Sequence, residues 1–439
     1  MARPRQRTPA EDAGTPANKF AYQDKLLGYR RSAYVVWEIT LKCNLSCQHC
    51  GSRAGEARDD ELKTDEALDL IRQLAEVGIT EVTLIGGEAF LRPDWLTLAR
   101  AIADAGMIPT MVTGGFGVNK FTAKKMKEAG IAQVSVSIDG MEKTHDYLRG
   151  KPGSWKQCFE TLSNFRAVDI PFAFNTQINR LSAPDLPQLY EAARDAGVNG
   201  WQYSLTVPMG NAADRPNILI QPCELLELFP VLARITNRAN QEGLRVLPGN
   251  DIGFFGPYEA ILRHEQFRLG AYWQGCQAGV GGLGIEADGK IKGCPSLPTD
   301  SYVGGNIRDM KLVDILQTKE LTFNINVGGT ARAKKELWGF CKTCEHAELC
   351  RAGCAWTSHV FFDRRGNNPH CHSRALKLKD RGVRERVEQI VKAEGTPFDN
   401  GKFKLIEEPI DAPWPDGDPL HFTADKVVWP DSWATWPSF

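Results

Sequence analysis

The sequence predicts an α/β fold, in which a partial (β/α)6 TIM-like barrel is followed by a small cysteine-rich domain that contains a β-hairpin. Short β-rich runs alternate with amphipathic helical stretches from residue 34 to about residue 242. Cysteines then gather in the last third of the chain, and the final stretch is rich in tryptophan and proline. These changes predict four segments: an N-terminal tail (1–33), the barrel (34–245), the cysteine-rich domain (246–387) and a Trp/Pro-rich extension (388–439).

The barrel prediction rests on six strand–helix units. The strands are AYVVWEIT, EVTLIGG, IPTMVTGG, QVSVSIDG, PFAFNTQI and WQYSLTV, and helix candidates such as TDEALDLIRQLAEVG separate them. Six units fall short of the eight that close a barrel, so an open barrel fits the pattern, and a doubly wound sheet is the alternative. In both architectures the active face lies at the carboxyl ends of the strands, where the sequence places a three-cysteine loop and a GGE turn.

The composition is that of a globular protein without a nucleic-acid or membrane surface. The chain has 439 residues, of which 42% are hydrophobic and 24% charged, and its net charge is −1. No stretch approaches the roughly 18 uninterrupted apolar residues of a membrane span, and the N-terminus lacks the apolar core of a signal peptide. We therefore expect a cytoplasmic protein whose 12 cysteines serve mainly as metal ligands rather than in disulfides. Cys158 and Cys223, which lie in helical stretches, are expected to be buried spectator thiols.

The loop after the first strand reads CNLSCQHC and carries Cys43, Cys47 and Cys50. A structural zinc site needs four closed ligands, and a disulfide framework needs an even number of cysteines. Three thiolates instead suit an iron–sulfur cube that keeps one iron open for another ligand. The alternative is a three-cysteine zinc site completed by His49 or by a distant residue.

On these residues the chain resembles the radical S-adenosylmethionine (radical SAM) superfamily, from about residue 34 to about residue 375. The resemblance implies that Cys43, Cys47 and Cys50 hold a 4Fe–4S cluster whose open iron is chelated by SAM. It also implies that one electron from the cluster cleaves SAM to a 5′-deoxyadenosyl radical, which abstracts hydrogen from a substrate. Such an enzyme needs an electron donor such as flavodoxin or ferredoxin.

Further positions match the SAM-binding pattern of that family. Gly86-Gly87-Glu88 resembles the GGE motif that contacts the methionyl amino group, and its glycines would let the backbone approach the ligand. An ordinary strand-to-helix turn is the alternative for these three residues. In VSIDG, Ser137 is the expected contact to the ribose and carboxylate of SAM, and Asp139 is expected to fix the turn.

Four more polar residues are expected near the barrel mouth. Arg149 is a candidate partner of the SAM carboxylate, with a solvated arginine as the alternative. Asn175, Gln177 and Gln202 interrupt otherwise apolar strands, and each is expected either to contact SAM or substrate or to make a structural hydrogen bond. The chain departs from the family pattern at 113–115, where TGG replaces the TNG of many relatives. The sequence identifies no catalytic acid or base.

The cysteines of the last third resemble the SPASM domain, an auxiliary-cluster extension found on peptide-modifying radical SAM enzymes. By that resemblance, a set of four thiolates closes one auxiliary 4Fe–4S cluster and a set of three holds a second. The four are Cys341, Cys344, Cys350 and Cys371, and the three are Cys276, Cys294 and Cys354. The hairpin IEADGKIKGCP is expected to present Cys294. We expect an open iron in the three-cysteine set, and a pair of zinc ribbons is the alternative for the whole region.

The resemblance favours a maturase that acts on a ribosomally made peptide or protein, by crosslinking, thioether formation, oxidation or epimerisation. Pro295 stands where sulfatase-maturing relatives have an aspartate, which disfavours sulfatase maturation. Only residues 1–33 precede the barrel, too few for a winged-helix peptide-recognition domain, so a separate leader-peptide recognition protein is expected. The alternatives are a radical SAM dehydrogenase or rearrangement enzyme for a small molecule, and a non-catalytic zinc-stabilised binding protein.

The C-terminal extension is rich in proline, which argues against a packed helical domain. Its tryptophans are expected either to bind a partner or to form a strap that buries them on the protein itself. They are Trp414, Trp429, Trp433 and Trp436.

Overall fold

The computed structural model describes residues 33–263, 273, 275–324, 335–415 and 418–433. The tail predicted over residues 1–33 lies outside the described residues except for Ala33, and Trp436 lies outside them as well. None of the described helices is both long and apolar enough to span a membrane.

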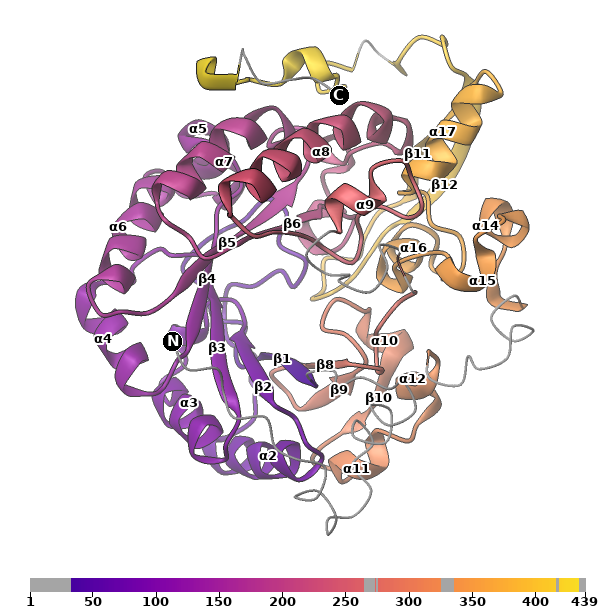
Figure 1. Cartoon of the computed structure of the whole chain (residues 1–439). Coiled ribbons are helices and arrows are strands. Elements are labelled where there is room, and N and C mark those ends of the chain that lie inside the picture. Colours follow the sequence, from indigo (N-terminus) through magenta and orange to yellow (C-terminus); the bar gives the residue numbers. More distant parts are fainter. Residues whose placement is uncertain (1–32, 264–272, 274, 325–334, 416–417, 434–439) are drawn as a thin grey trace.

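The central feature is one ten-stranded sheet, which curves around the middle of the molecule (Figure 1). Its strands β1 to β6 pair in chain order, each parallel to the next. Their bounds are β1 Tyr34–Glu38, β2 Glu81–Ile85, β3 Ile108–Thr113, β4 Gln133–Ser137, β5 Phe172–Ile178 and β6 Trp201–Leu205. This order confirms the partial barrel and rules out the doubly wound sheet, in which the strand order reverses at a switch point.

Helices form an outer arc around these strands (Figure 1). They are α2 Thr64–Glu76, α3 Trp95–Asp104, α4 Lys120–Glu128, α5 Glu142–Arg149, α6 Ser154–Arg166, α7 Leu186–Asp195 and α8 Leu225–Glu242. Apolar residues recur at helical spacing, so that each helix buries one face. In α2, for example, Leu70, Ile71 and Leu74 belong to the main hydrophobic core.

The inner face of the barrel is polar on β4 to β6. Successive side chains of a strand point to opposite faces, so the polar residues at every second position share one face. Ser137 of β4 lies in register with Asn175 of β5, which lies in register with Gln202 of β6. These three positions are half-buried or exposed, whereas the preceding row, which includes Val136 and Phe174, is fully buried in the core. The barrel therefore presents amide and hydroxyl groups towards its interior.

The sheet continues beyond the six predicted strands at both edges. β7 (Val246–Pro248) pairs parallel with β6, and β8 (Gly282–Ile285) pairs parallel with β1. β9 (Lys290–Lys292) and β10 (Val303–Asn306) then extend the sheet with antiparallel pairing. β8 and β9 form the predicted hairpin, whose turn contains Gly289 at φ 88°. Because β8 pairs with β1, the cysteine-rich segment is joined to the strand that leads into the three-cysteine loop.

Short helices and a second sheet complete the C-terminal part. The helices are α9 Glu259–Leu262, α10 Thr299–Tyr302, α11 Leu312–Ile315, α12 Lys319–Thr322, α14 Gly339–Thr343, α15 Ala347–Cys350, α16 Ala355–Phe362 and α17 His372–Asp380. β11 (Val383–Val391) and β12 (Lys402–Pro409) form an antiparallel pair that is separate from the barrel sheet.

The segment of the C-terminal extension that carries Trp429 and Trp433 packs on the outside of the barrel. The Trp433 ring is fully buried, and its centroid lies 5.6 Å from that of Tyr190 in α7. The guanidinium carbon of Arg238 in α8 lies 4.4 Å from the centroid of the Trp433 ring, and that of Arg234 lies 4.2 Å from the centroid of Trp429. Burial together with cation–π contacts supports the strap interpretation of these tryptophans.

Candidate active site

A cavity of about 340 Å³ lies at the carboxyl ends of the barrel strands and brings together residues that are distant in the sequence. The predicted residues that line it are Cys43, Cys47, Cys50, Gly86, Gly87, Ser137, Arg149 and Gln177. The predicted residues Glu88, Asn175 and Gln202 are not among its lining residues. Asn175 and Gln202 lie on the same inner face of the barrel, in register beside Ser137.

Backbone hydrogen bonds hold the three-cysteine loop in place. The Cys43 amide donates to Gly55 O at 2.8 Å, and the Gln48 amide donates to Leu148 O at 2.7 Å. Asn211, in the segment after β6, donates from its side chain to Cys47 O at 2.8 Å and from its amide to Cys50 O at 2.9 Å. The loop is therefore clamped between the end of α5 and the segment after β6.

Two glycines that sequence reasoning missed make this clamp possible. Gly150 (φ 62°) and Gly210 (φ 57°) both adopt the left-handed conformation. A Cβ atom at Gly150 would lie 2.3 Å from Ser46 O, and one at Gly210 would lie 2.3 Å from Cys50 O. Any side chain at either position would push the cysteine loop away, and the only sequence signal was the glycine itself.

The glycines of the GGE turn have a structural reason besides the predicted approach to the ligand, which stays a prediction. A Cβ atom at Gly86 would lie 2.3 Å from Thr40 O, and one at Gly87 would lie 2.5 Å from Leu41 O. The Gly87 amide donates to Thr40 O at 2.8 Å. The absence of side chains thus lets the GGE turn pack directly against the backbone that leads into Cys43.

Glu88 presents an unused hydrogen-bond acceptor. Glu88 is 1% exposed; its Oε2 accepts from the Gly114 amide at 2.8 Å and the Thr113 hydroxyl also lowers its pKa, whereas Oε1 has no hydrogen-bond partner. Burial raises the pKa of Glu88 to about 7. A Cβ atom at Gly114 would lie 2.5 Å from the Leu45 side chain, which explains why glycine occupies this position of the TGG sequence. A free buried acceptor and three thiols on one adjoining loop fit SAM and its cluster.

We expect Glu88→Gln to weaken SAM binding roughly ten- to hundredfold, because a hydrogen bond to a charged group contributes about 1.5–3 kcal/mol. Since the pKa of Glu88 is about 7, binding to the wild type should strengthen from pH 6 to pH 8 as the carboxylate forms. In Glu88→Gln, the increase in SAM affinity that depends on the Glu88 carboxylate should be absent. Equilibrium dialysis of labelled SAM against the anaerobic protein measures both effects, with Glu160→Gln, at an exposed glutamate, as the control. Equal affinities at both pH values would contradict the assignment.

Arg149 is buried, which excludes the solvated alternative. It is 8% exposed, and its Nη2 lies 2.7 Å from Oδ2 of the fully buried Asp139, which also contacts His49 Nε2 at 3.0 Å. Arg149 Nη1 lies 3.8 Å from Cys47 Sγ. Burial alone would lower the pKa of Arg149, but Asp139 and the Cys47 thiol outweigh it and the pKa is raised. Asp139 also accepts from the Gln177 amide at 2.8 Å, so it organises the site rather than only the turn.

Several residues that line the cavity were not predicted, among them Glu38, Met209, Trp356 and Phe398. Only Glu38 had a sequence signal, as a charged residue within an apolar strand. Burial raises its pKa to about 8, against the opposing effect of Arg58, which lies 3.3 Å away. Met209, Trp356 and Phe398 add an apolar wall to the cavity.

The structure gathers Cys276, Cys294 and Cys354 around one pocket, together with Tyr34 and Asn250. Burial, together with the nearby Cys276 thiol, raises the pKa of Cys294 to about 11. Metal binding here would therefore release protons. Among the described residues, no three histidine, cysteine, aspartate or glutamate side chains converge tightly enough to hold a single metal ion.

The other four cysteines form a separate group. Burial raises the pKa of Cys350, and the nearby thiols of Cys371, Cys341 and Cys344 raise it further. Cys371 in turn donates to Phe254 O at 3.7 Å. Electrostatic effects thus link Cys350 with the other three members of its predicted set, while the assignment of the two ligand sets stays a prediction.

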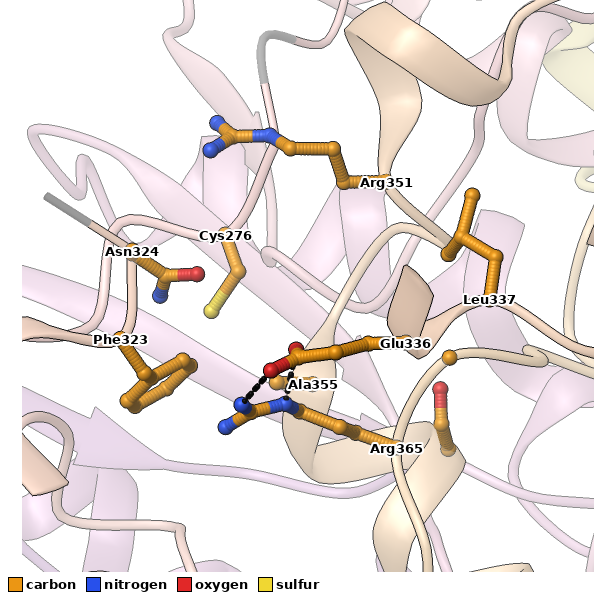
Figure 2. Close-up of a pocket in the computed structure, with 10 residues that line it drawn as sticks. Cys276, Phe323, Asn324, Glu336, Leu337, Arg351, Ala355 and Arg365 are labelled. Atoms are coloured by element: carbon orange, nitrogen blue, oxygen red, sulfur yellow. Dashed lines mark hydrogen bonds and ion pairs between the residues drawn. The ribbon is translucent and has the colours of Figure 1, made fainter. Parts of the chain in front are cut away.

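Cys276 also faces a second, outer pocket of about 50 Å³ (Figure 2). Figure 2 shows its thiol pointing into this pocket, between Asn324 on one side and the Glu336–Arg365 ion pair on the other. That pair is bidentate, with distances of 2.6 and 2.7 Å. Arg351 lies beyond Cys276 on α15's C-terminal side. Cys276 therefore borders two pockets, one that it shares with Cys294 and Cys354 and one that it shares with the Glu336–Arg365 pair.

Pro295 and Trp356 separate the three-cysteine pocket from the large cavity, because both residues line both spaces. The Trp356 indole N–H lies 3.2 Å from Met209 Sδ. The residue after Cys294 thus faces the cavity, and a proline there offers no acid or base.

Family models match two parts of the chain. The model described as the radical SAM superfamily matches residues 37–205, and the model described as an iron–sulfur cluster-binding domain, SPASM, matches residues 276–345.

Individual proteins match over most of their length. The chain is 30% identical to an AdoMet-dependent heme synthase of Methanosarcina barkeri, over 77% of this chain and 95% of that protein. It is 27% identical to the mycofactocin maturase MftC of Mycolicibacterium smegmatis, over 73% of this chain and 77% of that protein. The solved structure of anSMEcpe with bound AdoMet and a peptide superposes with a TM-score of 0.61 at 18% identity, over 78% of this chain and 94% of that one. This last likeness supports the fold alone.

Proposed function

This chain belongs to the radical SAM superfamily and carries its SPASM domain, and from that premise we propose that it modifies a ribosomally made peptide. Its cofactors are SAM, a 4Fe–4S cluster and auxiliary iron–sulfur clusters. When bound, they supply one electron and a 5′-deoxyadenosyl radical that abstracts hydrogen. The protein's own part is to hold the reacting groups in place and to exclude water.

In this proposal, Cys43, Cys47 and Cys50 hold the SAM-cleaving cluster and Glu88 receives the SAM amino group. Arg149 orients the cysteine loop through its contact with Cys47, while its pairing with Asp139 leaves it less available to the SAM carboxylate. We therefore propose a positioning role for Arg149, and its contact with the SAM carboxylate stays a prediction.

The charge of the cavity favours a peptide, and this observation carries the proposal. Among the described residues that line the cavity, Arg149 is the single arginine or lysine, and it is paired with Asp139. Ser137 and Gln177 line the same space and offer the hydroxyl and amide groups that peptide bonds recognise. A neutral amide substrate suits this lining better than one that carries several carboxylates.

Two further observations support a peptide. The chain resembles a protein named as a mycofactocin maturase over most of that protein's length. Three cysteines line one pocket and Cys350 feels the thiols of three others, which supports the two auxiliary ligand sets that the sequence pattern associates with peptide maturases. A separate leader-peptide recognition protein, a flavodoxin or ferredoxin as electron donor and a cytoplasmic location belong to the same proposal.

A second candidate is the conversion of an iron tetrapyrrole. The chain covers 95% of a protein named as an AdoMet-dependent heme synthase, and the apolar wall of Met209, Trp356 and Phe398 suits a flat ring. The paired state of Arg149 counts against it, because such rings carry carboxylate side chains that need cationic partners.

One experiment separates the two candidates. The anaerobic protein is incubated with SAM and dithionite, either with peptides encoded by short reading frames beside its gene or with iron coproporphyrin III. Mass spectrometry should show 5′-deoxyadenosine, unchanged porphyrin and a mass change in a peptide, which for epimerisation is the uptake of one deuterium when the reaction is run in D2O. Conversion of the porphyrin with every peptide unchanged would replace the proposal by the second candidate.

A further inference from the structure

A hairpin that follows the cysteine-rich region returns to the cavity at the centre of the barrel. β11 and β12 lie at the rim of the molecule, and the chain between them runs inward to the barrel mouth (Figure 1). We call residues 395–400 the hairpin tip. Phe398, within the tip, lines the same cavity as the three-cysteine loop, although nearly the whole described chain separates them.

A buried ion-pair network fixes the tip to the cysteine loop. Arg53 follows Cys50 closely, and its Nε lies 2.8 Å from Asp399 Oδ1. The Arg53 side chain is 12% exposed and that of Asp399 is 7% exposed, so the pair is largely shielded from solvent. The same guanidinium contacts Asp214 at 2.5 Å. The Gly210 amide also donates to Asp399 O at 2.8 Å, so the segment that clamps the cysteine loop holds the tip as well.

Phe398 is held in a conformation that is rare for its residue type. Its φ is 60°, in the left-handed region that phenylalanine seldom adopts. The ring packs against the apolar group of Val207, Met209 and Val360, and Lys292 Nζ lies 4.5 Å from its centroid. Strain of this kind persists where surrounding contacts fix it, and it concentrates at functional sites.

We propose that Phe398 is a specificity-determining residue that forms the substrate-side wall of the radical cavity. Together with Met209 and Trp356 it would admit an apolar side chain of the substrate and exclude water and bulkier groups. The nature of the admitted group rests on the proposed peptide substrate, whereas the wall itself rests only on the position of the ring.

The first test needs no substrate. In Phe398→Ala, ferricyanide should bleach the SAM-site cluster several-fold faster than in the wild type, because the open wall admits the oxidant. Phe398→Leu, which keeps most of the apolar bulk, should stay close to the wild type. Ile390→Ala is the matched control, since Ile390 lies on β11 of the same hairpin, is 56% exposed and does not line the cavity. Iron content and the thermal midpoint of each variant establish that it is folded.

The second test measures selectivity on peptides that differ only at the modified residue. Phe398→Ala should raise the ratio of kcat/KM for a bulky over a small apolar residue by about tenfold or more, as expected when a pocket gains room. Equal bleaching rates in Phe398→Ala and wild type, or an unchanged ratio, would overturn the proposal. If no peptide is converted, the proposed function fails, and the bleaching rates still decide whether Phe398 is the wall.

Discussion

Replacing Cys43, Cys47 and Cys50 together with alanine is expected to reduce SAM cleavage to the background of the assay. In the proposed site these three thiolates would hold the cluster that supplies the electron, and Glu88 and Arg149 offer no thiolate to replace them. The triple variant should also lose about four of roughly twelve irons, since two auxiliary clusters would remain. Quantifying 5′-deoxyadenosine and iron in the same anaerobic preparation measures both effects.

The control for this variant is Cys223→Ala, which removes a thiol that lies outside the three cysteine groups. It should keep its full iron content and cleave SAM at the wild-type rate. If the triple variant still made 5′-deoxyadenosine under dithionite at the wild-type rate, the cluster would have to be elsewhere. Loss of all iron instead would show that the cysteine groups fold as one unit.

The barrel was predictable because its signal is local. Apolar residues recur every second position in the strands and about every 3.6 positions in the helices, and this alternation of strands and helices predicts parallel pairing. Six such units correctly predicted an open barrel. β7 was missed because three residues, Val246–Pro248, are too few for a periodic signal. The hairpin turn at Gly289 was predictable for the same local reason, since its sequence contains a tight-turn signal.

The candidate site was predictable only where spacing encodes chemistry. Three cysteines at fixed intervals predict a cluster. The clamp on the cysteine loop was not predicted, because Gly150 and Gly210 act through contacts between segments that are distant in the sequence. The role of Phe398 was equally hidden, because the sequence placed it in a tryptophan-rich extension rather than beside Cys50. The division of the chain at residues 245 and 387 stays a prediction.

Arg149→Met is expected to destabilise the protein by roughly 3–5 kcal/mol, the usual cost of leaving one member of a buried ion pair without its partner. Asp139 is fully buried, and His49 would remain as its only other ion-pair partner among the described residues. The thermal midpoint of the anaerobic protein measures the loss. Arg72→Met is the control, because that arginine is 58% exposed and its ion pairs contribute little.

The stability lost in Arg149→Met should increase as the pH rises. In the wild type, burial would raise the pKa of Asp139, but Arg149 and His49 outweigh it and the pKa is lowered. This carboxylate therefore stabilises the fold above its unfolded-state pKa, and the contribution is lost only as the pH falls through the folded-state value. Without Arg149, burial dominates, so the folded variant binds a proton that the unfolded chain releases. The difference in the free energy of unfolding between the wild type and Arg149→Met should therefore increase from about pH 5 to about pH 8.

Adding Asp139→Asn to Arg149→Met should restore part of the lost stability, because the double variant no longer buries an unpaired carboxylate. The expected coupling between the two substitutions is about 0.5–3 kcal/mol, read from a cycle of the wild type, both single variants and the double variant. The pH dependence of Arg149→Met should disappear in the double variant, since asparagine does not titrate. Strictly additive losses, or a gap that narrows as the pH rises, would show that Arg149 acts through Cys47 rather than through Asp139.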